Sequence, residues 1–258
     1  MGPLSTEAII LRSIRYSEAD RILHLYSVDR GRLAAIAKGA RKTTSRFGGR
    51  LEPFVRVRID LHEGRSELLT VTGVAVVAAH AHLRRSARAL DFAARACDAV
   101  GRLFDTGEAH PAVFNLLCNA LALLHREPAG ATLERALSFR LKLLHAAGLA
   151  PRLAACANCS ARAALVRFSG AAGGVLCARC AASAGGEGFA LAPAAREFMV
   201  GALARPLALA PGAEERALAQ AERALGSILA HHAHLRLLPA LGEQRAPAAR
   251  LAVAAEVA

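Results

Sequence analysis

Strict alternation of apolar and polar positions marks the first third of the chain. Between residues 55 and 62 every second residue is Val, Ile or Leu, and the residues between them are charged or polar. A period of two is typical of a strand with one buried face. Similar short runs separated by polar turns predict five strands, at residues 6–14, 21–27, 32–38, 51–62 and 68–77. So many short strands in so few residues favour a small closed barrel of the OB type.

The pattern changes after Leu83, where apolar residues recur every three or four positions and predict helices. Pro111 and Thr132 are suited to the starts of helices, and Gly148 to the end of one. We expect helices over residues 83–104, 112–125, 132–147, 193–203 and 214–238. The predicted fold class is therefore α+β, with a barrel domain at residues 1–80 and an α-helical domain at residues 81–242. Residues 243–258 lack both periodicity and caps, so we expect a flexible tail.

The amino-acid composition indicates which kind of partner to expect. The chain has 258 residues, long enough for two compact units, and a formal net charge of +12 from 33 Lys plus Arg against 21 Asp plus Glu. Such an excess favours an acidic partner, nucleic acid above all. Aromatic residues make up only 4% of the chain, and Trp is absent. Because arginine usage can also follow coding bias, the positions of the arginines carry more weight than their number.

Basic residues gather in one stretch, residues 38–58, which holds seven Lys or Arg against the single acid Glu52. Its first part, residues 38–50, is called the basic loop below. Glycines at positions 39, 48 and 49 let such a loop bend along a line of phosphates. With one arginine upstream, the predicted DNA-binding residues are Arg32, Lys38, Arg41, Lys42, Arg46, Arg50, Arg56 and Arg58. The alternative is that these residues only solvate the surface.

Two C-x2-C pairs form the most specific motif. Cys156 and Cys159 are followed, after seventeen residues, by Cys177 and Cys180. This spacing is typical of a zinc site with four thiolate ligands, which leaves no open position for a substrate and is therefore structural. We expect Zn2+ to replace the core of a small insert at about residues 151–189, called the cysteine module below, with a short hairpin between the pairs. The alternative is a redox-active dithiol.

We expect no metal-binding or catalytic role for the other cysteines or for a group of three histidines. Cys97 and Cys118 lie on apolar helical faces, where a free cysteine usually acts as a small buried hydrophobe. Three neighbouring histidines, His231, His232 and His234, lack a nearby Cys, Asp or Glu to complete a metal site, so we expect solvated side chains.

Catalytic constellations are not evident in the sequence. The acidic residues of the barrel region are scattered, and no G-x4-G-K-[ST] motif for nucleotide hydrolysis occurs. We therefore expect a binding protein and not an enzyme. No run of eighteen apolar residues and no secretory pattern at the N-terminus is seen, so a cytoplasmic protein without membrane association is expected.

Three stretches resemble the bacterial RecO family of recombinational repair proteins, in the order in which the family has them. They are SEADRILHLYS at residues 17–27, KGARKTTSRFGGRLEPF at residues 38–54 and FRLKLLHAAGLAPRLAACANC at residues 139–159. The resemblance implies an N-terminal OB fold, an α-helical domain and a four-cysteine zinc module, in agreement with the patterns above.

The resemblance also implies a function. The family binds single- and double-stranded DNA, anneals complementary strands and works with RecR to load RecA onto DNA covered by single-stranded DNA-binding protein, at the nucleoid. Its helical domain contacts the acidic C-terminal tail of that protein, and Arg135, Arg140 and Lys142 are candidates for this contact. The residue patterns alone leave two alternatives open, an RNA- or ribosome-associated OB and zinc protein and a nucleic-acid-processing enzyme.

Overall fold

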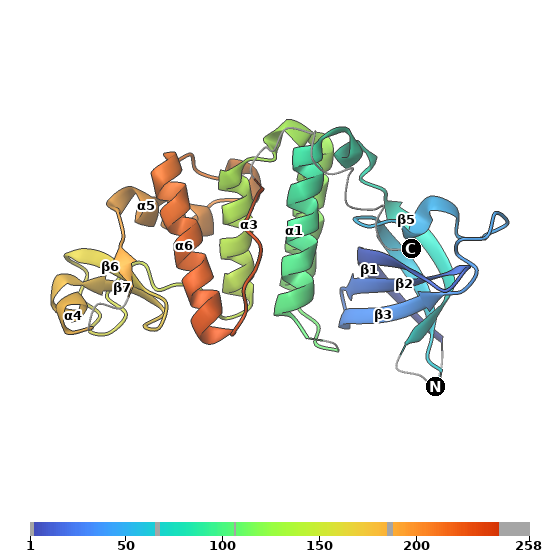
Figure 1. Cartoon of the computed structure of the whole chain (residues 1–258), viewed down its shortest axis with the longest axis horizontal. Coiled ribbons are helices and arrows are strands. Elements are labelled where there is room, and N and C mark those ends of the chain that lie inside the picture. The colour runs from blue at the N-terminus through green and yellow to red at the C-terminus, as the bar shows by residue number, and fades with distance from the viewer. Residues whose placement is uncertain (1–2, 65–67, 106, 185–187, 243–258) are drawn as a thin grey trace, which may run out of the picture.

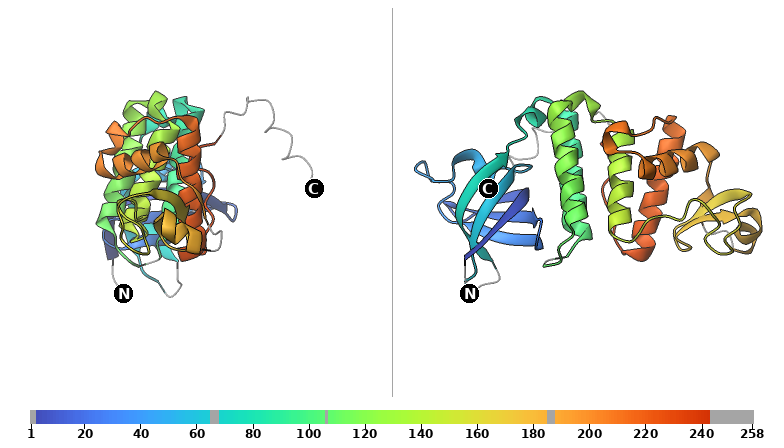
Figure 2. Two further views of the ribbon diagram at one scale, coloured as in Figure 1. Left: turned by 90° about the vertical axis from the view of Figure 1, so that its left-hand side faces the viewer. Right: turned by 180° about the vertical axis from the view of Figure 1, so that it is seen from behind.

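The computed structural model describes residues 3–64, 68–105, 107–184 and 188–242. The molecule is elongated, with a β-barrel at one end, a layer of helices in the middle and a small β-containing module at the other end (Figures 1 and 2). The predicted α+β class is confirmed. The expected tail at residues 243–258 lies outside the described residues.

Five strands close the barrel in the order β1-β2-β3-β5-β4. They are β1 (Pro3–Tyr16), β2 (Asp20–Ser27), β3 (Gly31–Ala37), β4 (Arg56–His62) and β5 (Leu69–Ala78). β3 and β5 pair in parallel through Ala35 with Leu69 and Ile36 with Thr70, whereas the other neighbours are antiparallel. This strand order is that of an OB barrel.

The alternation that predicted β4 fills the barrel core. Val57, Ile59 and Leu61 are completely buried, while Arg58 and Asp60 are exposed. The strand begins at Arg56, however, and not at residue 51 as expected. Residues 48–51 form the short helix η1, and Gly48 and Phe54 adopt left-handed backbone angles, with φ of +53° and +72°, which a strand does not accommodate.

The helical domain has five main helices among the described residues. They are α1 (Ala87–Leu103), α2 (Pro111–Arg126), α3 (Leu133–Ala146), α5 (Pro193–Ala204) and α6 (Glu215–His232). The short helix η2 (Ala81–Arg85) precedes α1, η3 (Pro128–Gly130) lies between α2 and α3, and η4 (Leu207–Leu209) lies between α5 and α6. The expected start of α3 is confirmed, because the Thr132 hydroxyl accepts a hydrogen bond from the backbone N–H of Arg135 at 3.3 Å. Gly148 follows α3 with φ of +73°.

α6 is shorter than expected, because it ends at His232 and not at residue 238. The chain then turns at His234, which has φ of +48°, and runs back over the helices as an extended segment. Arg140 on α3 donates hydrogen bonds to the carbonyls of Leu238 and Pro239. These tertiary contacts compete with continued helix formation and are invisible in the local apolar pattern.

The cysteine module consists of β6 (Leu165–Ser169), β7 (Gly174–Cys177), the helix α4 (Ala178–Ser183) and β8 (Phe189–Ala190). β6 and β7 pair in antiparallel, which confirms the expected hairpin, and the sheet order is β7-β6-β8. The turn of the hairpin packs on α6, where the Nε2 atom of His232 lies 2.8 Å from the carbonyl oxygen of Gly170.

Barrel and helices share a hydrophobic core. Alternate residues of β1 point in opposite directions, so Ala8 and Ile10 are part of the barrel core while Ile9 and Leu11 pack with the helices. On β2, Tyr26 joins the helical core, with its ring 6.1 Å from that of Phe104 in an edge-to-face arrangement. The barrel is therefore attached to α1 by a continuous apolar interface.

The turn between β2 and β3 reaches the segment that follows α1. Gly31 has φ of +61°, and a Cβ atom built there would overlap the backbone oxygen of Glu108. Glycine is required here both by its backbone angle and by the close approach of another chain segment.

We predict that Gly31→Ala lowers the free energy of unfolding by at least about 1 kcal/mol, because alanine is strained at positive φ and meets the Glu108 backbone. Urea denaturation followed by circular dichroism measures the change. Gly49→Ala is the matched control, since a Cβ atom there has nothing within 4 Å. Equal stability of the two variants would contradict the proposed close contact.

His80 is buried at the junction between the barrel and α1. His80 is 6% exposed, and its Nδ1 atom lies 2.7 Å from the carbonyl oxygen of Phe54, to which the neutral ring donates a hydrogen bond. Burial lowers the pKa of His80 below 6.5, and the charges of His125 and Arg56 lower it further, although the Phe54 hydrogen bond opposes them. The folded protein therefore favours the neutral ring.

Stability should consequently fall as the pH drops below 6.5, because the unfolded chain then binds a proton on His80 that the folded chain does not yet bind. We predict that His80→Asn, a residue that tolerates left-handed backbone, reduces the stability lost between about pH 7.5 and about pH 5.5. Denaturation at the two pH values is the measurement. The exposed His231→Asn should keep the wild-type dependence. The same dependence in both variants would argue against this role of His80.

Candidate nucleic-acid interface and metal site

The basic loop joins β3 to β4 and projects from the end of the molecule opposite the cysteine module (Figure 1). Two apolar side chains anchor it, since Phe47 and Leu51 are each 2% exposed and belong to the barrel core. A turn precedes the first anchor, where the backbone N–H of Ser45 donates to the carbonyl of Lys42 at 2.9 Å. The loop is thus a built part of the barrel and not a loose excursion.

The turn between β1 and β2 holds the other side of the loop. Asp20 accepts a hydrogen bond from the backbone N–H of Gly39 at 2.8 Å. The guanidinium of Arg41 donates to the carbonyls of Ser17 and Glu18, at 3.2 and 3.0 Å. Arg41 therefore shapes the loop as well as contributing charge to it.

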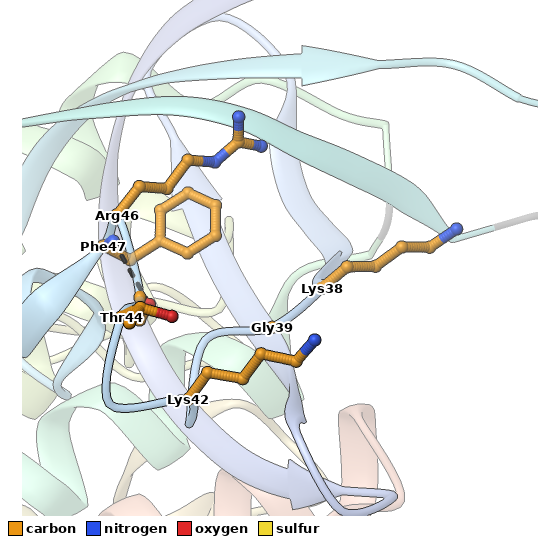
Figure 3. A pocket seen from close by; sticks show the side chains of 7 residues that line it. Lys38, Gly39, Lys42, Thr44, Arg46 and Phe47 are labelled. Carbon is orange, nitrogen blue, oxygen red and sulfur yellow. Dashed lines mark hydrogen bonds between the residues drawn. The ribbon is translucent and has the colours of Figure 1, made fainter.

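A pocket of about 240 Å³ lies in the curve of the loop. Figure 3 shows the amines of Lys38 and Lys42 extending toward the same side of it, with Arg46 beside Phe47. The guanidinium of Arg46 lies 4.9 Å from the centre of the Phe47 ring. The full lining is Lys38, Gly39, Lys42, Thr44, Ser45, Arg46 and Phe47.

Three cations and two hydroxyl-bearing residues around one hollow suit a phosphate group, which accepts hydrogen bonds from both kinds of donor. Within the described part of the chain, Lys38 and Lys42 form no ion pair. The sequence prediction missed Thr44 and Ser45. Their position between Lys42 and Arg46 was the available signal, because hydroxyl side chains commonly contact phosphates.

The structure divides the eight predicted DNA-binding residues into groups. Six of them are exposed. Five of these lie on the basic loop, namely Lys38, Arg41, Lys42, Arg46 and Arg50, and the sixth is Arg58. Arg50 donates to the carbonyl of Val74 on β5 at 3.3 Å. Arg58 lies on β4, where it pairs in register with Glu7.

Arg32 and Arg56 instead contact the helical domain. Arg32 donates to the carbonyl of Gly101 at the end of α1, at 2.6 Å. Arg56 is hydrogen-bonded to Glu7, which raises its pKa, and its guanidinium lies 5.7 Å from the centre of the Phe114 ring. Both side chains thus help to hold the barrel on the helices. The basic loop therefore holds most of the predicted DNA-binding residues that remain open to a ligand.

The four cysteines of the cysteine module meet at one point. Their sulfur atoms all lie within 4.8 Å of one another, with those of Cys159 and Cys177 separated by 3.6 Å. A tetrahedral zinc site with Zn–S bonds of about 2.3 Å places sulfurs about 3.8 Å apart. The residues present therefore fit a four-coordinate metal ion.

The backbone around the cluster favours the thiolate form of Cys156 and Cys159, whereas a hydrogen bond with the Cys159 sulfur, together with burial, raises the pKa of Cys180 to about 12. Burial acts to raise the pKa of Cys156, but hydrogen bonds from the N–H groups of Cys177, Cys159 and Asn158 lower it to about 6. The N–H of Ala161 likewise lowers the pKa of Cys159. Because thiolates are the form that binds metal, and because four sulfurs and not two converge, a metal site fits this geometry better than a redox dithiol.

Of the remaining candidate ligands, the two cysteines match the expectation, whereas His232 contacts the carbonyl of Gly170 and is not simply solvated. Cys97 and Cys118 are 2% and 7% exposed, and burial raises the pKa of Cys118 to about 11, so their role as buried apolar side chains is confirmed. Across the described ranges, the residues grouped closely enough for metal binding are the four cysteines, and His231, His232 and His234 are not among them.

The three candidates for the acidic tail are engaged inside the helical domain. Arg140 is 6% exposed, and its carbonyl contacts and its ion pair with Glu222 at 3.7 Å hold it in the interior. Lys142 donates to the carbonyl of Leu203 at 3.0 Å, and Arg135 pairs with Glu127 at 2.9 Å. Burial of Arg140 removes it from the surface residues that a partner could reach.

None of the helices in the described ranges has the length and apolar character needed to cross a membrane.

A closed OB-type barrel with a cationic loop, joined to helices that carry a four-thiol cluster, is an architecture typical of nucleic-acid-binding proteins. Comparison with known proteins narrows this class. Residues 1–80 match the family described as Recombination protein O N terminal, and residues 84–239 match Recombination protein O C terminal. The chain belongs to the RecO family of DNA repair proteins.

Individual relatives match over most of their length. The chain is similar to the DNA repair protein RecO of Anaeromyxobacter dehalogenans (strain 2CP-C), with 35% identity covering 92% of this chain and 94% of the relative. It is 39% identical to the protein of the same description in Rubrobacter xylanophilus, covering 90% and 93%. With that of Geobacter sulfurreducens it shares 37% identity over 70% and 74%.

Proposed function

We propose that this protein is a DNA-binding recombination mediator. It binds single- and double-stranded DNA, anneals complementary strands and, together with RecR, helps to load RecA onto DNA covered by single-stranded DNA-binding protein. The observation that carries the proposal is the anchored basic loop, in which Lys38, Lys42 and Arg46 surround one pocket on an OB-type barrel. Membership of a DNA repair family supports DNA as the polyanion.

The chemistry of the loop suits annealing. Lysine and arginine side chains neutralise phosphates, which every strand presents, and leave the base edges open for pairing. Two strands bound near the same cationic loop repel each other less than they do in water. The protein acts in this step by positioning and neutralising charge, so no bond is made or broken and no catalytic residue is required.

Partners follow from the same proposal. The acidic C-terminal tail of single-stranded DNA-binding protein binds the helical domain, RecR binds the mediator, and RecA is reached indirectly through the complex. A mediator of this kind works in the cytoplasm at the nucleoid.

We also propose that the cysteine module binds one structural Zn2+ through Cys156, Cys159, Cys177 and Cys180. One side of the module packs on the helices through Phe168, Val175 and Phe189, which belong to the helical core. The other side has a small cluster formed by three of the cysteines, Leu176 and flanking alanines. The metal would supply there the cross-linking that so few apolar atoms cannot.

The basic loop is tested by removing charge that has no structural task. We predict that the triple variant Lys38→Ala, Lys42→Ala, Arg46→Ala loses most of the acceleration of annealing between two complementary DNA oligonucleotides. The control Arg162→Ala, Arg205→Ala, Arg216→Ala removes the same net charge from exposed positions of the cysteine module and helical domain. It should anneal as the wild type does. If both variants lost the same acceleration of annealing, the effect would depend on net charge alone and not on the basic loop.

Salt dependence tests the phosphate contacts quantitatively. If the loop neutralises about five phosphates, log Kd for single-stranded DNA should change with log salt with a slope of magnitude about 3.5, and the triple variant should be correspondingly flatter. A wild-type slope near zero would contradict the electrostatic mechanism. Faster annealing of RNA than of DNA strands would instead favour an RNA-binding function, and turnover of labelled DNA with Mg2+ an enzymatic one.

Metal binding is tested by Cys156→Ser. We predict a loss of the bound zinc found by elemental analysis of the wild type, together with a lower melting temperature, because the module loses its cross-link. Cys118→Ala is the control, since Cys118 lies outside the cluster and should leave the zinc content unchanged. The barrel should keep its DNA affinity in Cys156→Ser. Full zinc content in that variant would refute the four-thiolate site.

A further inference from the structure

The outer face of β1, β2 and β3 is divided into a covered half and an open half. The covered half carries Ile9, Leu11 and Tyr26, which pack with the helices, and Arg32, which reaches the end of α1. Farther along the same strands, toward the turn between β1 and β2, the helices do not cover the face (Figure 1). This open half is adjacent to the basic loop.

Three isoleucines form a row across the open half. Strand register pairs Ile14 with Ile22 and Ile22 with Ile36, so their side chains lie side by side on one face. None of the three belongs to the hydrophobic clusters of the described residues. Ile14 is 40% exposed, and Tyr16, two positions farther on the same face, is 50% exposed. This apolar surface, Ile14, Tyr16, Ile22 and Ile36, is called the isoleucine row below.

Cations border the isoleucine row. Arg12 is exposed on β1, two positions before Ile14 on the same face, and Lys38 follows β3 directly where the row ends. The neighbouring carboxylate of Asp20 is occupied by the N–H of Gly39, and that of Glu52 pairs with Arg21 at 3.2 Å. An apolar strip within a cationic border complements a ligand with flat apolar faces and negative charges along its edge.

We propose that the isoleucine row is a stacking surface for the bases of a single DNA strand whose phosphates lie in the basic loop. The inference rests on the proposed function and specifies how the two DNA forms are distinguished. A single strand can turn its bases onto the row, and Tyr16 supplies an aromatic ring for one of them. In a duplex the bases are stacked and paired internally, so a duplex reaches the phosphate-binding loop alone.

The geometry connects the two contacts. Arg41 of the basic loop is bonded to the carbonyls of Ser17 and Glu18, directly after Tyr16. Lys38 both follows β3 and lines the phosphate pocket. Phosphate-binding and base-binding groups are therefore held in fixed register by one hairpin and one loop, as a continuous strand requires.

The test separates single-stranded from duplex binding. The variant Ile14→Thr, Tyr16→Ala, Ile22→Thr keeps β-branched residues in the strands while removing apolar surface. Fluorescence anisotropy at fixed salt measures its affinity for labelled oligothymidylate and for a duplex of the same length. We expect Kd for the single strand to rise at least about fivefold, the equivalent of one lost stacked base, and Kd for the duplex to stay unchanged.

Two controls accompany this variant. Val76→Thr, Val77→Thr removes exposed apolar groups, 43% and 47% exposed, from β5 and should alter neither affinity. Tyr16→Phe keeps an aromatic ring and should bind the single strand as the wild type does. Because the chain has two tyrosines and no tryptophan, and Tyr26 is buried, quenching of tyrosine emission by oligothymidylate reports directly on Tyr16.

Each outcome is decisive. An unchanged single-strand Kd, or an equal loss for single strand and duplex, overturns the stacking surface. Dissociation of a wild-type dimer in the variant, seen by sedimentation with DNA affinity unchanged, would instead make the isoleucine row an interface between two copies. The triple variant of the basic loop should weaken both DNA forms. If it weakens neither, the proposed function fails, whatever the isoleucine row does.

Discussion

The structure depends on a single strand being buried from both sides. Four consecutive residues of β1, Ala8 to Leu11, are at most 4% exposed, and they alternate between the barrel core and the core shared with the helices. A strand with two buried faces cannot slip by one residue without exchanging its two sets of contacts. The orientation of the barrel on α1 is therefore fixed, and with it the direction in which the basic loop points.

That constraint separates the chemistry of the molecule into distinct regions. The side of the barrel that faces the helices uses Arg32 and Arg56 as structural cations, whereas the opposite side presents Lys38, Lys42 and Arg46 to the solvent. Positively charged side chains therefore have two roles: those that face the helices stabilise the interface, and those that face the solvent are available to a ligand. The four-cysteine cluster lies in the module at the far end of the helices (Figure 1), where few apolar residues surround it.

Local patterns in the sequence were sufficient for much of this architecture. The alternation at residues 55–62 located the core residues of β4, and the cysteine spacing located four sulfurs that do converge. The errors lie where distant residues decide. The start of β4 depends on the backbone at Phe54. The end of α6 depends on Arg140, which binds the carbonyl of Leu238, a residue that had been assigned to the helix. Likewise, whether an arginine is exposed depends on tertiary packing, which the local pattern of apolar and polar residues does not reveal.

The four-thiol cluster has a consequence for how this protein can change over generations. As ligands of the zinc ion proposed above, four sulfurs within 4.8 Å are useful only together, since three of them cannot complete a four-thiolate site and lack a core beneath them. A lineage that lost one cysteine would gain little by keeping the others. Descendants should therefore retain the whole quartet or replace it as a group with apolar residues, while Phe168, Val175 and Phe189, which dock the module on the helices, persist in both lineages.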